Sequence, residues 1–145
     1  MLRSGLLTLA VSALVLAIRT THAAPLDSYR MLSLVNDARQ SAGEQPVELT
    51  LVLNEDAYHH SNYQASLGAV THNDSHGSGS ERLSEEGVHL GYWSENVAFT
   101  HGDEDEAFRT WMNSPGHRKN ILSPAATHMG ISEVKGYWTQ VFAQL

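Results

Sequence analysis

The C-terminal segment from Met129 to Leu145 contains the pattern that most restricts the fold of this chain. Two runs rich in β-branched and aromatic residues, MGISEV and YWTQVFA, stand on either side of Lys135 and Gly136. Runs of this kind, separated by a two-residue turn that contains glycine, are typical of an antiparallel hairpin. The segment therefore predicts two paired strands.

The segments before this hairpin predict helices. Apolar residues three apart predict a helix over residues 26–42 that ends before Gly43, and Thr50 and Gly68 are suited to begin and end a second helix. Further patterns predict a short helix over 81–86, a short buried strand over 97–99, and a helix that opens at the acidic run 103–106 and stops at Pro115-Gly116. These elements predict an α+β domain, with helices flanking a small antiparallel sheet.

The first 23 residues have the pattern of a secretory signal peptide. A basic start at Arg3 precedes an uncharged apolar run over 5–18, and Thr21-His22-Ala23 supplies the small residues of a cleavage site. The apolar run is shorter than the roughly 20 residues that a stable membrane span needs. We therefore expect residues 1–23 to be removed, residues 24–145 to form one secreted domain, and the mature protein to have no stable membrane insertion.

Charge and cysteine content exclude several classes of function. Removal of residues 1–23 would take away Arg3 and Arg19, leaving 7 basic and 16 acidic residues and a formal charge of −9. Such a charge argues against nucleic acid and anionic membranes as partners. The chain has no cysteine, so disulfides, thiolate metal sites and a cysteine nucleophile are excluded.

Glu95 and His117 stand on either side of the predicted helix that opens at 103–106, which suggests that a carboxylate and an imidazole come together. The adjacent pair His59-His60 would point about 100° apart on a helix and could not hold one ion together. No HExxH or G-x-S-x-G motif occurs, and Ser94 and Ser114 are the only serines close in sequence to candidate bases. Asn73 begins an N-glycosylation sequon.

Seven short segments together resemble a known family. In chain order they are LVNDAR, HHS, THND, SENVAF, W-x-x-SPGHR-x-NIL, MGI and YWTQVFA. The ordered set resembles the CAP superfamily of cysteine-rich secretory, antigen 5 and pathogenesis-related-1 proteins, and particularly its cysteine-free microbial branch. The resemblance covers essentially all of residues 24–145 and implies an α-β-α sandwich with a central cleft.

Many members of this superfamily carry two histidines and two glutamates in the cleft. By motif position, His72 resembles the first histidine, Glu95 the glutamate of the G-E-N motif, and His117 the histidine of the G-H motif. Ser114 stands where the second glutamate is expected. The resemblance thus implies a cleft with His72, Glu95, Ser114 and His117, and a weak, pH-sensitive zinc site at His72 and His117 with Glu95 nearby.

The function that the sequence favours is a secreted, non-enzymatic binding module. Roles reported in the superfamily include sterol and fatty-acid binding, host interaction and contested proteolysis, so the expected ligand is a small apolar molecule such as a sterol or fatty acid, or an extracellular protein partner. One alternative is a zinc-assisted hydrolase with Glu95 as the general base. Another is a structural or host-interaction protein without a ligand.

Overall fold

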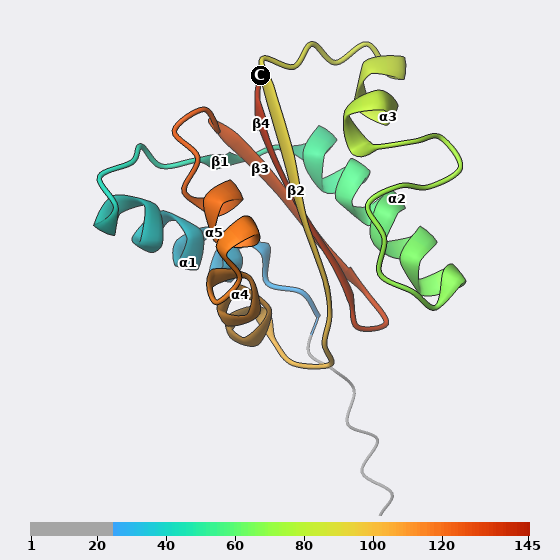
Figure 1. Ribbon diagram of the computed structural model, residues 1–145, viewed down its shortest axis with the longest axis horizontal. Coiled ribbons are helices and arrows are strands. Elements are labelled where there is room, and N and C mark those ends of the chain that lie inside the picture. The colour runs from blue at the N-terminus through green and yellow to red at the C-terminus, as the bar shows by residue number, and fades with distance from the viewer. Residues whose placement is uncertain (1–24) are drawn as a thin grey trace, which may run out of the picture.

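The computed structural model describes residues 25–145, so the predicted signal peptide lies outside the described residues (Figure 1). The described chain contains both helices and strands, as expected for an α+β domain. Its elements are α1 Ser28–Ser41, β1 Glu48–Leu49, α2 Leu51–Leu67, α3 Gly79–Glu85, β2 Tyr92–Phe99, α4 Glu104–Met112, α5 Pro115–Ile121, β3 His128–Val134 and β4 Tyr137–Gln144. Over these residues, no helix is both long enough and apolar enough to cross a membrane.

The strands form one four-stranded sheet in the order β1-β3-β4-β2. The predicted hairpin is confirmed, because β3 and β4 pair antiparallel around Lys135 and Gly136. Both turn residues have positive φ, 52° and 86°, as a two-residue turn that matches the twist of the strands requires. The sheet is mixed rather than purely antiparallel, since Glu48 and Leu49 pair in parallel with β3. A strand of two residues is too short to show an alternating pattern in the sequence.

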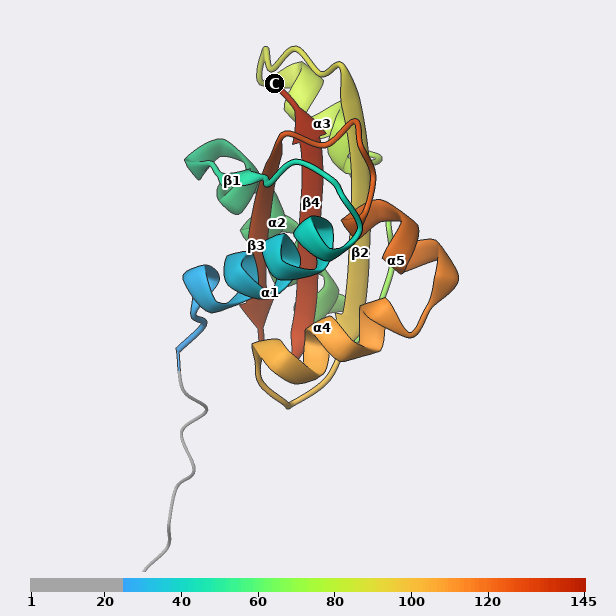
Figure 2. The same cartoon turned by 90° about the vertical axis from the view of Figure 1, so that its left-hand side faces the viewer.

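Helices cover both faces of the sheet, which confirms the α-β-α sandwich. In Figure 1, α2 and α3 lie on one side of the strands and α1, α4 and α5 on the other, and Figure 2 shows the second group in front of the sheet. One core cluster, including Met31, Trp111 and Phe142, lies between the sheet and α1, α4 and α5. A smaller cluster, including Leu53 and Leu83, lies under α2 and α3. The domain therefore has an apolar layer on each face of the sheet.

Several predicted boundaries need correction. Pro115 does not end a helix but begins α5, where proline is favoured because the first turn needs no N–H partner. Strand β2 is longer than predicted and starts at Tyr92 rather than Val97. Helix α3 starts at Gly79, two residues earlier than expected, because Ser78 and Glu81 form a capping box. The predicted ends of α2 are correct, with Thr50 as N-cap and Gly68 in the left-handed region.

Candidate functional site

The site is built on β2, which stands at one end of the strand order. Helix α5 is fixed against this strand by two side-chain amides. Asn120 donates to the backbone carbonyl of Glu95 at 3.1 Å, and Asn96 donates to the backbone carbonyl of His117 at 3.2 Å. These bonds satisfy a backbone group of an edge strand and hold His117 beside Glu95.

Glu95 and His72 form the central contact of the site. The Glu95 side chain is almost fully buried, at 1% exposure, whereas the His72 side chain is 57% exposed. His72 donates from Nδ1 to Glu95 Oε1 at 2.9 Å. This hydrogen bond, together with the charge of Glu95, raises the pKa of His72, although partial burial opposes the effect. A buried carboxylate thus orients an exposed imidazole and favours its cationic form.

His117 has the opposite electrostatic tendency. Burial lowers its pKa, and the positive charge of His72 lowers it further. That His72 and His117 form one site stays a prediction. The Nδ1 atom of His117 is buried and has no hydrogen-bond partner among residues 25–145. The site therefore combines an imidazole that favours the cation with one that favours the neutral form.

The geometry of these residues does not form a ready zinc site. In the described part of the chain, no three His, Cys, Asp or Glu side chains are arranged to hold a metal ion. Glu95 Oε1 is already bonded to the ring nitrogen of His72. Glu95 leaves the other ring nitrogen of His72 available, and zinc binding at His72 and His117 stays a prediction.

The serines contribute less to this site than the imidazoles. Ser114 occupies the N-cap position of α5 but its hydroxyl makes no capping bond. Ser94 is buried, and its Oγ finds no partner in the described structure. Side chains alternate along a strand, so Ser94 points to the face opposite Glu95. Asn73, beside His72, is exposed, and its glycosylation stays a prediction.

A buried ionic network lies behind Glu95 and was missed in the sequence. His60 is fully buried, donates from Nε2 to the Thr71 carbonyl at 2.6 Å, and lies 3.7 Å from Glu95 Oε1. Arg82 pairs with Asp56 at 2.8 Å and with Asp74 at 2.9 Å. The helical spacing of Asp56, His60 and Gln64, which places all three on the buried stripe of α2, was the available signal.

This network contains more negative than positive fixed charge. The side chains of Asp56, Asp74 and Glu95 are 4%, 7% and 1% exposed, and Arg82 is the guanidinium that faces all three. Its Nη2 atom is 3.9 Å from Glu95 Oε2, beyond hydrogen-bond distance. Burial raises the pKa of Asp56 despite the opposing effect of Arg82. The environment therefore disfavours ionisation of the Asp56 carboxyl.

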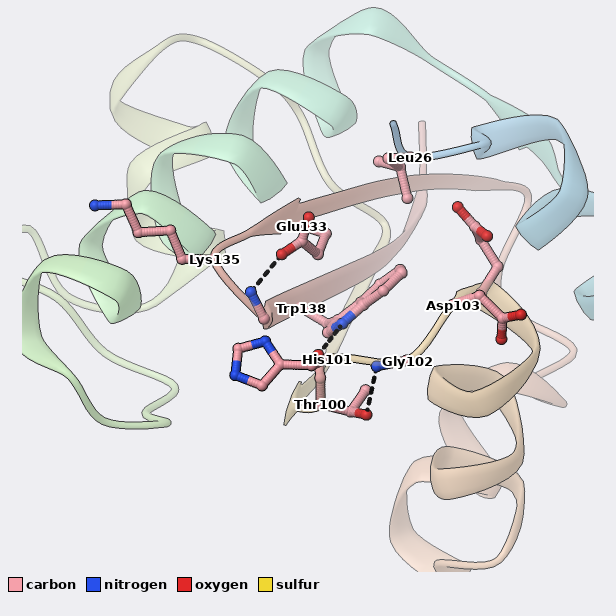
Figure 3. Close-up of a pocket in the computed structure, with 10 residues that line it drawn as sticks. Leu26, Thr100, His101, Gly102, Asp103, Glu133, Lys135 and Trp138 are labelled. Atoms are coloured by element: carbon pink, nitrogen blue, oxygen red, sulfur yellow. Dashed lines mark hydrogen bonds between the residues drawn. The ribbon is translucent and has the colours of Figure 1, made fainter. Parts of the chain in front are cut away.

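Two cavities near the ends of the strands and helices described above are lined by residues other than His72, Glu95 and His117. The first, about 330 Å³, lies between the β3–β4 turn and the start of α4, and Figure 3 shows Glu133, Trp138 and His101 around it. The second, about 420 Å³, adjoins the ionic network. It is lined by Asp56, His59, Tyr63, Asp74, Ser75, His76, Arg82, Glu85 and Glu86.

Comparison with known proteins places this architecture in a family. Residues 32–143 match CAP, described as the cysteine-rich secretory protein family. The uncharacterized protein YkwD of Bacillus subtilis is 32% identical over 130 residues, which cover 85% of this chain and 51% of YkwD. The chain therefore spans about half the length of that relative.

Two solved structures share the fold. An extracellular protein containing a SCP domain from Bacillus anthracis has a TM-score of 0.76 and 26% identity, over 81% of this chain and 40% of that one. An outer surface protein from Borrelia burgdorferi has a TM-score of 0.72 and 14% identity, over 85% of this chain and 98% of that one. With the family match over most of its length, this chain belongs to the CAP family of cysteine-rich secretory proteins, as a member without cysteine.

Proposed function

We propose that this chain is an extracellular, non-enzymatic binding domain that recognises its ligand at the patch formed by exposed His72, half-buried His117 and buried Glu95. The observation that carries the proposal is the hydrogen bond between buried Glu95 and half-exposed His72. It fixes one imidazole at the surface in a defined orientation. An extracellular location is supported by relatives whose names describe extracellular and outer-surface proteins.

The two imidazoles suit a ligand with a polar head. His72, with its raised pKa, offers a charged donor to an oxygen such as a carboxylate, whereas His117, with its lowered pKa, offers a neutral ring that can accept a hydrogen bond. Leu67 and Val70, which shortly precede His72 in the chain, are 54% and 46% exposed. The finer proposal is therefore an amphiphile, a fatty acid or a sterol, whose head meets the imidazoles and whose apolar body lies against these side chains.

The local chemistry favours binding over hydrolysis. A general base must be able to reach the proton of a water or a nucleophile. The Oε1 atom of Glu95 accepts a hydrogen bond from His72, and its Oε2 atom is buried away from solvent. The hydroxyls of Ser94 and Ser114 make no hydrogen bond to either imidazole in residues 25–145. These features support a role for Glu95 in positioning His72.

Native mass spectrometry of the secreted protein, offered a mixture of fatty acids and sterols and separately zinc, tests this proposal. We expect an amphiphile adduct that His72→Ala and Glu95→Gln weaken. The matched control is His101→Ala, which changes an exposed histidine beside the other cavity.

Equal adducts in all variants would contradict the proposed patch. An absence of any lipid adduct would contradict the amphiphile and favour an extracellular protein partner or a structural role. A zinc adduct lost in both His72→Ala and His117→Ala would establish the metal site instead.

A further inference from the structure

We propose that Gln64 is a positioning residue of the binding patch, which holds the backbone of Thr71 so that the next residue, His72, meets Glu95. Gln64 lies on α2, and its side chain is fully buried. Its Oε1 atom accepts a hydrogen bond from the backbone N–H of Thr71 at 3.1 Å. The inference rests on the proposed function, because it concerns how the same patch is assembled.

The segment that carries His72 has little regular structure of its own. Residues 68–78 join α2 to α3 and contain neither a helix nor a strand, apart from a bridge between Asp74 and Gly77. Connecting segments of this kind are mobile unless other groups bind their backbone. The position of His72 in front of Glu95 therefore depends on contacts that the rest of the domain makes to this loop.

Two buried side chains of α2 hold Thr71 by both of its backbone groups. Gln64 accepts from the N–H of Thr71, and His60 donates from Nε2 to its carbonyl at 2.6 Å. The two side chains thus give this residue the hydrogen bonds that a neighbouring strand would otherwise supply. Gln64 and His60 are four residues apart, so they project from the same face of the helix.

Gln64 also ties this loop to the centre of the sheet. Its Nε2 atom donates to Thr139 Oγ1 on β4 at 3.0 Å, so both ends of the amide are bonded and its orientation is fixed. The contacts run from β4 through Gln64 to Thr71. The adjacent His72 then returns to the sheet at Glu95 of β2. An apolar side chain of similar shape would fill the core about as well, so the amide points to a role in placing the loop.

Amide hydrogen exchange of the native protein tests the first of these contacts without a variant. We expect the Thr71 N–H to exchange at least about ten-fold more slowly than the N–H of Val70, because Gln64 bonds to the first. Val70 is an exposed residue of the same loop and serves as the internal reference. Equal exchange at the two positions would overturn the proposal.

Three variants test whether this contact places His72. Gln64→Met removes the acceptor but keeps a side chain of similar length, whereas Gln64→Glu keeps an oxygen for Thr71. Asn62→Met, at an exposed position of the same helix, is the matched control. We expect the NMR signals of the His72 ring to shift in Gln64→Met, to return toward their native positions in Gln64→Glu, and to stay unchanged in the control. Affinity for oleate should fall by about two- to ten-fold in Gln64→Met.

Unchanged His72 signals in Gln64→Met, or shifts that Gln64→Glu does not reverse, would overturn the proposal. Equal shifts in α1 and α4, on the other face of the sheet, would indicate a general loss of structure and would overturn it as well. If oleate did not bind the native protein but the His72 signals responded as expected, the proposed function would fail and the positioning role of Gln64 would stand.

Discussion

Two arginines buried on opposite sides of the sheet are held in different ways. Arg39, on α1, is fully buried and donates to the backbone carbonyls of Gln45, Ile121, Ser123 and Ala126. Arg82, on α3, is 9% exposed and faces three carboxylates instead. Burial lowers the pKa of Arg39. Within residues 25–145, no acidic side chain is bonded to it to offset this effect. Arg39 thus makes its hydrogen bonds to neutral backbone carbonyls, whereas Arg82 makes its contacts to charged carboxylates.

The difference distinguishes a region whose buried polar groups are paired from one in which some are not. The carbonyls around Arg39 belong to the loops that join α1 to β1 and α5 to β3 and to Ile121, the last residue of α5. This residue therefore ties these segments together in a domain without disulfides. The region around Arg82 leaves buried polar atoms of Asp56, His60 and Glu95 without partners in the described chain. Such groups cost stability and are typical of binding and catalytic sites. We therefore expect substitutions on the two sides to have different consequences.

Arg39→Ala should have the largest effect on stability. It removes hydrogen bonds to four buried or part-buried carbonyls and leaves a cavity, so we expect a loss of about 3–5 kcal/mol in the free energy of unfolding. Urea denaturation measures this loss. Arg118→Ala, at an exposed position, is the matched control and should change stability by less than about 0.5 kcal/mol. Equal effects would remove the structural role given to Arg39.

Arg82→Gln should also destabilise the fold, by about 3 kcal/mol at pH 7, and the cost should depend on pH. The folded-state pKa of Asp56 is already raised by burial, and loss of Arg82 should raise it further. A carboxyl with a raised folded pKa destabilises the fold above that pKa and regains stability as pH falls toward its unfolded value of about 3.9. The loss at pH 5 should therefore be smaller than at pH 7. A loss that is independent of pH would contradict the charge imbalance.

Asn120→Ala should have a smaller effect, about 1–2 kcal/mol, because it removes bonds to the Glu95 carbonyl and to Asn96 Oδ1. It should also loosen α5 and shift the NMR signals of the His117 ring. Asn113→Ala, at the exposed end of α4, provides the comparison. If both variants left the His117 signals unchanged, Asn120 would not hold α5 in place.

The parts of the fold with strong local signals were predictable. The β3–β4 hairpin and the ends of α2 follow from turn and capping residues whose conformations have few alternatives. Strand β2 was predicted too short because Ser94, Glu95 and Asn96 are polar but buried, and buried polar residues in a strand do not show the usual alternation. Proline can either end a helix or begin one, and the sequence around Pro115 does not show which of the two roles it has.

The site was predictable only in part. Glu95, His72 and His117 were identified from motifs, and the structure brings Glu95 and His72 into contact. His60 was overlooked because the adjacent pair His59-His60 was considered only as a joint metal ligand. One histidine of such a pair can still point into the core, as His60 does. The role of Arg82 depends on the approach of α3 to α2 and β2, which no local pattern in the sequence specifies.

The most direct test of the role of Glu95 is an NMR titration of the imidazoles of His72 and His117, in the native protein and in Glu95→Gln. We predict a pKa for His72 above 6.5 and for His117 below 6.5. A histidine with a raised folded pKa contributes stability that is complete below its unfolded value and is lost as pH rises through the folded value. Glu95→Gln should lower the His72 pKa and remove that contribution. A His72 pKa that is unchanged in Glu95→Gln would show that the buried carboxylate does not set the state of the exposed imidazole, and would contradict the proposed binding patch.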